Sequence, residues 1–271
     1  IYQTAAQLDG DIKMLTEKMR DLRQAVFNRN NLIINITADS SGLTLAEKEM
    51  AAFTDKLPEG GIKSVSSFSV PKRIAAGIAL PSQVNYCART LPAPAYADKA
   101  TAMLLVASRY LSNGYLYKTI RVQGGAYGGM SLYDPTLGLF SFLSYRDPHI
   151  AQTINAFRKA ESIIAQSKIS REEINKAITG TIAMLDKPTD PAGRGVTAMM
   201  REFAKVTDEM RQQVRDRILK ASAAQLKEAT RQYFAQAGDR AACAVYGTAE
   251  KINEANEQLA EKLTLESLLD T

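Results

Sequence analysis

The sequence predicts an α+β fold in which an antiparallel or mixed sheet is backed by helices. Three strand-like runs, rich in β-branched and aromatic residues, lie between residues 74 and 147. Long stretches with helical periodicity follow, and one more strand-like run comes near the end of the chain. Strands that come first, helices that come later and a single closing strand are typical of a sheet layer covered by helices.

The chain opens with a helix, a strand and a second helix. Apolar residues at helical spacing predict a helix over residues 8–27. The run NLIINITA predicts a strand at Asn31–Ala38, closed by a turn-forming Asp-Ser-Ser-Gly segment. A capping box formed by Thr44 and Glu47 then predicts a helix that continues to about Leu57.

The middle of the chain supplies most of the expected sheet and helices. A capping box formed by Ser170 and Glu173 marks the start of one of these helices. Strands are expected at Ile74–Leu80, Gln83–Thr90 and Gly138–Asp147. Helices are expected at about Ala95–Leu111, Tyr115–Ile120, 148–167, 171–186, 194–205 and 208–220.

The end of the chain repeats the order of its beginning. A capping box formed by Ser222 and Gln225 starts a helix, and the strand Ala241–Gly247 follows. Thr248 then caps a last helix that reaches about Leu263. Helix, strand, turn and helix thus occur twice, which predicts two consecutive copies of one α+β unit.

This repetition predicts the domain organisation. Residues 1–60 are expected to be the carboxy-terminal end of one repeat unit, and residues 61–271 a complete second unit. A length of 271 residues agrees with one or two domains. The opening residues, IYQTAAQLDGDIK, show neither an initiator Met nor a signal peptide, which predicts a processed product or a piece of a longer chain.

The composition is that of a soluble globular protein, with 45% hydrophobic and 23% charged residues. No apolar run approaches the roughly 20 residues that span a bilayer, so no membrane association is expected. A compartment such as the cytoplasm or an organelle matrix fits these properties. Cys87 and Cys243 each lie in an apolar stretch, which predicts two buried thiols and no disulfide framework.

Positive charge is concentrated in the middle of the chain. Residues 61–160 contain eleven Lys and Arg against three Asp, in a protein with a net charge of +5. Nucleic-acid binding is one interpretation of such a segment. The basic residues are scattered singly, however, and no zinc-finger, helix-turn-helix or RNA-binding signature accompanies them. Nucleic acid is therefore not expected as a partner, and docking on an acidic surface explains the charge at least as well.

Self-sufficient catalysis is not expected from the residues present. His149 is the single histidine, so neither H-E-x-x-H nor H-x-x-E-H can be built, and no metal ligand is predicted. No G-x-S-x-G elbow accompanies it to suggest a catalytic triad. The GGAYGG run lacks the Lys-Ser/Thr pair of a phosphate-binding loop. As a lone histidine before a helix, His149 is interpreted as a surface or capping residue.

One constellation could act on a peptide. Arg121 precedes Tyr127 by six residues, with Gly124 and Gly125 between them. Glycines let the backbone turn tightly and let another chain approach closely. A guanidinium and a phenol both donate hydrogen bonds, which suits them to grip a peptide near a scissile bond. A tight turn with a paired arginine and a core tyrosine is the alternative, and composition alone favours it.

Longer matches in this region point to a family. The segment R-V-Q-G-G-A-Y-G-G (Arg121–Gly129), followed by F-S-F-L-S-Y-R-D-P (Phe140–Pro148), resembles the pitrilysin/insulinase family of zinc peptidases, in its presequence-protease and falcilysin branch. The resemblance continues at Pro81–Tyr86 and Lys176–Ile182. It covers the complete last repeat unit, and Asn31–Asp39 resembles the end of the preceding one.

The resemblance implies a pitrilysin-type repeat unit, one of four that enclose a peptide chamber in two halves. In this family the zinc site lies in the first unit, and the last unit contributes an arginine and a tyrosine that reach across the chamber to the substrate. By position these are Arg121 and Tyr127, with Gly124 and Gly125 beside the substrate. The implied cofactor is none in this chain and zinc in a longer parent. The implied partners are a peptide substrate and the amino-terminal, zinc-bearing half of that parent.

The resemblance therefore implies the carboxy-terminal, substrate-binding part of a zinc metalloendopeptidase that degrades unstructured peptides in a closed chamber. Alone, such a chain is expected to be inactive because it lacks the zinc site. The alternative is a non-catalytic scaffold or partner subunit of the same fold. The presence of both Arg121 and Tyr127 favours the enzyme, because a scaffold needs neither.

Overall fold

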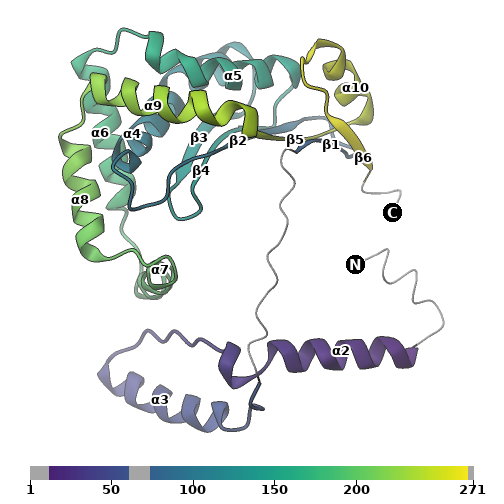
Figure 1. The fold of residues 1–271 in the computed structure, drawn as a ribbon, viewed down its shortest axis with the longest axis vertical. Helices are drawn as coiled ribbons and strands as arrows, with labels where there is room; N and C mark the ends of the chain where they lie inside the picture. Colours follow the sequence, from purple (N-terminus) through teal and green to yellow (C-terminus); the bar gives the residue numbers. More distant parts are fainter. Residues whose placement is uncertain (1–11, 61–73, 268–271) are drawn as a thin grey trace. The chain divides into compact units, whose positions relative to one another are not determined.

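The computed structural model describes residues 12–60 and 74–267, which fall into two compact units. The first unit holds the helices α2 (Ile12–Val26), α3 (Ser40–Thr54) and α7 (Pro191–Phe203). The second unit holds the sheet and the other helices (Figure 1). The boundary at residue 60 between two repeat units stays a prediction.

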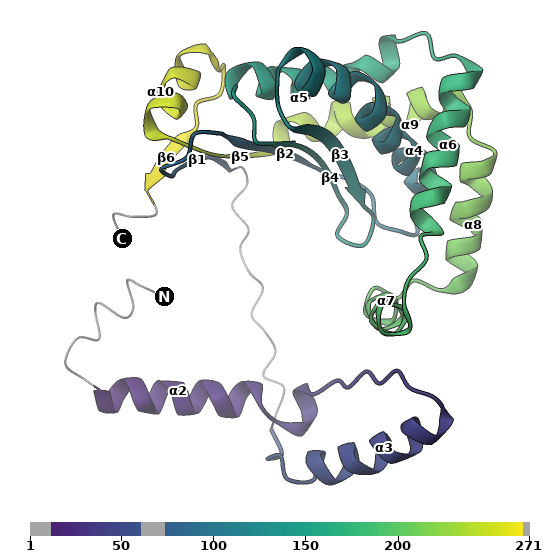
Figure 2. The same cartoon turned by 180° about the vertical axis from the view of Figure 1, so that it is seen from behind.

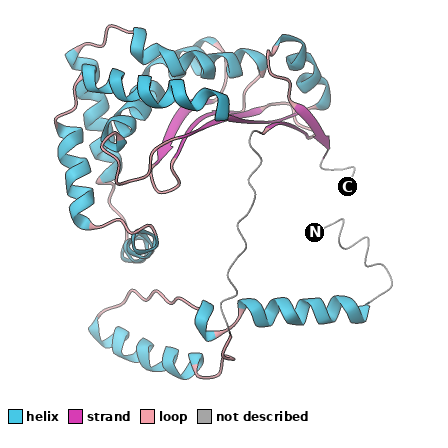
Figure 3. Cartoon of the chain, viewed as in Figure 1, coloured by secondary structure: helices cyan, strands magenta, loops and turns pink. Residues whose placement is uncertain are grey.

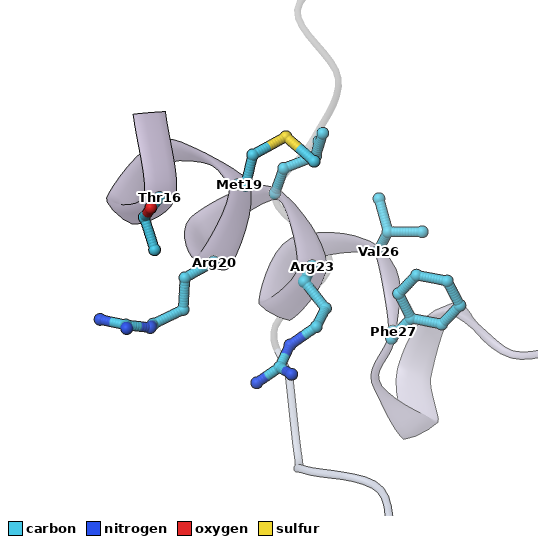
Figure 4. Close-up of a pocket in the computed structure, with 7 residues that line it drawn as sticks. Thr16, Met19, Arg20, Arg23, Val26 and Phe27 are labelled. Atoms are coloured by element: carbon cyan, nitrogen blue, oxygen red, sulfur yellow. The ribbon is translucent and has the colours of Figure 1, made fainter. Parts of the chain in front are cut away.

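Helix α2 has an exposed apolar stripe. Four apolar side chains at helical spacing are each more than half exposed: Ile12, Met19, Leu22 and Val26. Figure 4 shows the shallow groove along this stripe, with the Arg20 and Arg23 side chains pointing away from Met19 and Val26. The helical periodicity predicted for this segment is confirmed from Ile12 onward, and the part expected before Ile12 lies outside the described residues.

The strand predicted at Asn31–Ala38 was wrong. After a short turn, η1 (Arg29–Asn31), the chain runs to Asp39 without regular structure. A β-rich segment becomes a strand only where another strand offers ladder partners, and none of the described residues pairs with it. Instead, the Asn35 amide donates to the Gly195 carbonyl of α7 at 2.6 Å. The strand expected in both copies of the repeat is therefore present only near the end of the chain, at Ala242–Gly247.

Helix α3 starts five residues earlier than predicted. Its N-cap is Asp39, whose carboxylate accepts a hydrogen bond from the Gly42 N–H at 2.7 Å, and this bond lowers the pKa of Asp39. The predicted capping box at Thr44 is not used. The Thr44 hydroxyl donates instead to the Ser40 carbonyl, one turn back in the same helix.

A single mixed sheet confirms the predicted α+β class. Its strands lie in the order β3-β4-β2-β5-β1-β6. The pairs of β1 with β5 and with β6 are parallel, and the other pairs are antiparallel. The strands are β1 (Ala75–Ala79), β2 (Tyr86–Pro92), β3 (Gly128–Asp134), β4 (Leu139–Tyr145), β5 (Ala242–Gly247) and β6 (Thr264–Ser267).

The helices of the second unit lie on one side of the sheet, as Figures 2 and 3 show. The predicted capping boxes form at Ser170 and Ser222. In each, the serine hydroxyl accepts from the backbone N–H three residues later, and the side chain of that later residue accepts from the serine N–H. The helices are α4 (Thr101–Leu111), α5 (Ala151–Gln166), α6 (Arg171–Leu185), α8 (Asp208–Leu219), α9 (Ala223–Ala237) and α10 (Ala249–Gln258).

Helix α4 differs from its prediction at both ends. It begins at Thr101 and not near Ala95, because the Asp98 carboxylate accepts from the Ala100 N–H at 2.7 Å and holds a turn there. At its other end it continues directly into η2 (Ser112–Gln123), a π-helix that replaces the separate short helix expected at 115–120. Wide π-turns inside helices are frequent at functional sites.

The last helix is shorter than expected. Thr248 caps α10 as predicted, with its hydroxyl accepting from the Lys251 N–H. The helix ends at Gln258, however, and does not reach Leu263. The Asn256 side chain makes two hydrogen bonds with the Leu263 backbone, at 2.7 and 2.9 Å, which turn the chain toward the unpredicted edge strand β6.

The core lies between the sheet and helices α4, α5 and α9. Phe140 and Phe142 of β4 face Phe157 of α5 and Phe234 of α9, with ring centroids 4.8 to 6.1 Å apart. Arg89 of β2 is buried in the same layer. Within the described ranges, no helix is long and apolar enough to cross a membrane.

Candidate functional site

Arg121 lies in the last turn of η2 with its side chain exposed. Its guanidinium carbon is 5.6 Å from the centre of the Tyr117 ring and 5.7 Å from that of Tyr127. At this distance the positive guanidinium is attracted to the π electrons of the aromatic ring, a cation–π interaction. The two tyrosines therefore orient Arg121 without occupying its hydrogen-bond donors.

Two glycines end the π-helix and turn the chain. Gly125 adopts a φ of 76°, a left-handed conformation that disfavours side chains, and its N–H donates to the Arg121 carbonyl at 3.0 Å. A Cβ at Gly124 would lie 2.7 Å from the Ile120 carbonyl oxygen. Both glycines are thus required by the turn itself, and their predicted contact with substrate stays a prediction.

Tyr127 follows the turn, immediately before β3. Its side chain is 66% exposed, and its ring meets Tyr145 of β4 edge-on at 5.8 Å. Gly128, the next residue, lies opposite Tyr145 in the β3–β4 ladder. The predicted pair is therefore brought together at one edge of the sheet, and the alternative of a core tyrosine is excluded.

The donors of this pair are available. Among the described residues, neither the Arg121 guanidinium nor the Tyr127 hydroxyl has a hydrogen-bond or ion-pair partner, so the alternative of a paired arginine also fails. An exposed guanidinium beside an exposed phenol presents two adjacent donors to a ligand carbonyl or oxyanion.

Tyr117 and Tyr145 were not predicted from the sequence. Tyr117 contacts Arg121, and Tyr145 contacts Tyr127. Tyr117 precedes Arg121 by four residues, a helical spacing that places the two side chains on one face. Tyr145 lies two strand positions after Leu143, on the face opposite Phe140 and Phe142. Both periodicities are visible in the sequence and could have identified these rings.

The other candidate groups have structural roles. The exposed His149 donates its backbone N–H to the Asp147 carboxylate at 2.9 Å. Cys87 and Cys243 are buried and free, as predicted. Burial raises the pKa of both thiols, that of Cys243 to about 11, so neither is a ready nucleophile at neutral pH. Within the described residues, no group of three or more His, Cys, Asp and Glu side chains could hold a metal ion.

Comparison with known families identifies the chain. A model of the family described as PreP C-terminal domain matches residues 76–235, which include the whole Arg121–Tyr127 turn. The chain belongs to this family. The resemblance inferred from the glycine-rich turn is thereby confirmed.

Presequence proteases from other organisms match this chain over most of its length, well beyond the Arg121–Tyr127 turn. Presequence protease 1, chloroplastic/mitochondrial, from Arabidopsis thaliana is 34% identical over 95% of this chain and 24% of its own length. The mitochondrial presequence protease of Saccharomyces cerevisiae is 29% identical over 81% of this chain and 23% of its own length. The chain thus spans about a quarter of the length of these relatives.

Solved structures show the same fold at low sequence identity. The peptidase M16 inactive domain from Pseudomonas fluorescens superposes with a TM-score of 0.57 at 16% identity, over 76% of this chain and 51% of that one. Pitrilysin superposes with a TM-score of 0.53 at 12% identity, over 84% of this chain and 25% of that one. These likenesses confirm the predicted pitrilysin-type fold.

Proposed function

We propose that this chain is the substrate-clamping part of a zinc metalloendopeptidase that degrades unstructured peptides in a closed chamber. Arg121 and Tyr127 would act on the peptide at its scissile bond. The proposal rests on one observation: an exposed guanidinium lies against an exposed tyrosine, and both keep their donors unoccupied by any described residue. Because both groups are exposed, their donors face solvent and can donate to a ligand carbonyl without breaking a bond within the fold.

The chemistry follows from what these two groups can donate. The carbonyl oxygen of a peptide bond gains negative charge as the bond is attacked. A phenol hydroxyl and a guanidinium that are held in place stabilise that charge more than the neutral carbonyl. The Tyr117 and Tyr127 rings both lie within 5.7 Å of the Arg121 guanidinium carbon, and these contacts reduce the reorientation needed when the charge develops.

The zinc that the family implies does not fit this chain. The single histidine is exposed and alone, both cysteines are buried with raised pKa values, and no metal-binding cluster occurs in the described part of the chain. We therefore place the metal in another part of a longer protein, the amino-terminal half, and propose that this chain alone does not cleave peptides.

The relatives' names extend the proposal to substrate and compartment. They are presequence proteases of mitochondria and chloroplasts. For this chain we propose an unstructured peptide substrate, and a compartment such as an organelle matrix or the cytoplasm. The excess of basic residues in 61–160 gives no reason to assign it a preference for basic peptides.

A non-catalytic partner subunit is the second candidate. The observation that favours it is the likeness to a domain from Pseudomonas fluorescens that is named as inactive. In such a subunit the Arg121–Tyr127 pair would have no effect on turnover. The effect of removing one hydroxyl therefore separates the two functions.

The deciding experiment is Tyr127→Phe in the full-length peptidase. If the hydroxyl stabilises the transition state, kcat falls by roughly 100- to 1000-fold, while melting temperature and zinc content stay unchanged. Arg121→Lys is expected to lower kcat as well, because an ammonium does not reproduce the guanidinium's spread of donors. The control, Tyr110→Phe, deletes a hydroxyl in the helical layer and should keep wild-type kcat. Wild-type kcat for Tyr127→Phe would favour the non-catalytic subunit.

A further inference from the structure

A row of tyrosines crosses the sheet from the Arg121–Tyr127 pair. The Tyr127 ring meets Tyr145 at 5.8 Å, and Tyr145 meets Tyr86 of the next strand at 5.4 Å, both edge-on. Tyr86 is in turn paired with Tyr246 in the β2–β5 ladder. We call Tyr127, Tyr145, Tyr86 and Tyr246 the tyrosine row. It runs across the strands and begins at the proposed site.

The helices of this unit leave one face of the sheet open (Figure 2), and strand alternation places the tyrosine row on that face. Strand alternation turns Cys87 and Val245, the cross-strand pair next to Tyr86 and Tyr246, into the helix-covered core. Tyr145 and Tyr246 are 47% and 40% exposed, and Tyr86 is half-buried. These rings thus present flat apolar surface and hydroxyls together, a combination that is frequent at binding surfaces.

Small side chains lie beside the row. The next cross-strand level on the same face pairs Leu143 of β4 with Ala88 of β2, and Ala88 with Ala244 of β5. The two alanines in the middle of the sheet end close to the backbone, so the neighbouring tyrosine rings stand above them. The small side chains therefore leave space beside the rings, where the side chains of an extended peptide can pack against them.

The six strands contribute almost no charge to the open face, and Arg121 lies beside its Tyr127 end. Arg89, Asp134 and Glu266 are the charged residues of the six strands. Arg89 points into the helix-covered core, and the other two lie near strand ends on the opposite edge strands β3 and β6. An acidic or nucleic-acid ligand would find no counter-charge in the middle of this face. The chemistry selects apolar and aromatic side chains.

We propose that the tyrosine row is a peptide subsite for aromatic and large aliphatic side chains. This inference rests on the proposed function and deepens it, because the row starts at the pair that would hold the scissile bond. The row is on the order of 15 Å long, which an extended peptide covers with about four or five residues at roughly 3.3 Å each. Specificity should therefore extend about three to five residues from the cleaved bond.

The kinetic test uses Tyr86→Ala in the full-length peptidase. Two peptides share one cleavage sequence, and they carry either Phe and Leu or Ser three to five residues from the cleaved bond. Tyr86→Ala should lower the apolar-over-polar ratio of kcat/KM by about three- to tenfold, because an aromatic contact is removed. The fall in kcat/KM should come from a higher KM with kcat unchanged, because the contact stabilises the bound substrate and the transition state equally. Tyr246→Ala is the second variant if Tyr86→Ala folds poorly.

Controls separate this inference from the proposed function. Leu219→Ala removes an exposed apolar side chain from α8 and should leave the ratio unchanged. Fluorescence anisotropy with the labelled Phe/Leu peptide measures binding to the 271-residue chain without any turnover. Tyr86→Ala should weaken that binding about three- to tenfold, whereas Tyr127→Phe should not. Failure of the Tyr127→Phe turnover prediction with this binding loss intact would count against the proposed function alone.

Two results would overturn the subsite. One is an equal loss of kcat/KM for both peptides in Tyr86→Ala, with unchanged peptide binding by the chain. The other is concentration-dependent self-association of the chain, measured by sedimentation, that Tyr86→Ala abolishes while peptide binding is absent. The tyrosine row would then be an interface between two copies of the chain.

Discussion

Gly129 of β3 lies so close to Ile120 of η2 that no side chain fits between them. A Cβ at Gly129 would be 2.6 Å from the Ile120 Cβ and 3.2 Å from the Leu116 carbonyl oxygen. Gly129→Ala must therefore push the strand and the π-helix apart. We expect a loss of about 1–3 kcal/mol in the free energy of unfolding, measured by urea denaturation. Because Arg121 lies on η2 and Tyr127 directly precedes β3, kcat of the proposed full-length peptidase should fall too.

Gly114 in the same π-helix provides the matched control. A Cβ there meets no atom within 4 Å. Gly114→Ala removes conformational freedom from the unfolded chain without a clash, so stability should stay the same or rise by up to about 1 kcal/mol. Equal losses for the two variants would show that the contact of Gly129 with Ile120 is not the cause.

Asp147 links the end of β4 to the start of α5. Its carboxylate accepts from the His149 N–H at 2.9 Å and from the Thr153 hydroxyl at 2.7 Å, and its backbone bridges to Asn85. Asp147→Ala leaves the buried Thr153 hydroxyl and the partly buried His149 N–H unpaired and should cost about 1–3 kcal/mol of stability. A double-mutant cycle with Thr153→Val measures the share of the hydroxyl bond. Additive losses would contradict a direct interaction.

Arg89 and Glu161 form an ion pair of 2.6 Å in the sheet–helix layer, with side chains 5% and 15% exposed. Glu161→Ala leaves the guanidinium buried without its counter-charge and should cost about 3–5 kcal/mol. Replacing both residues by apolar ones should restore much of that loss. The control is Glu228→Ala, which breaks the exposed pair with Arg231 and should cost at most about 1 kcal/mol. Chemical denaturation of the variants measures these differences.

The sequence predicted those elements whose signals are local. The capping boxes at Ser170 and Ser222 fixed two helix starts, because a cap depends on side chains three residues apart. The strand at Asn31–Ala38 failed because a strand depends on a distant partner, which composition does not report. Strand β6 was missed for the same reason. Its pairing with β1 depends on the turn that Asn256 stabilises.

For the candidate site, the sequence identified the residue types. The structure shows whether their hydrogen-bond donors already have partners within the fold. The motif located Arg121 and Tyr127, but it left open whether their polar groups were already satisfied. That depends on the neighbours that the fold provides. Here those are the rings of Tyr117 and Tyr145, which contact the pair through their faces and edges and leave its donors unoccupied. The row that continues to Tyr86 requires the order of the strands, which no local pattern predicts.

The buried thiols and Tyr133 predict a decline of stability in alkali. Burial raises the pKa of Cys243 from its usual 9.0 to about 11 and that of Tyr133 from its usual 10.0 to about 12. The folded chain thus holds these protons at a pH where the unfolded chain has released them. Their contribution is therefore complete below pH 9 and is lost as the pH rises through these folded-state values. Urea denaturation should give a lower free energy of unfolding at pH 10 than at pH 8. Cys243→Ala should decline less steeply over that interval, and an unchanged slope would show that this thiol does not contribute.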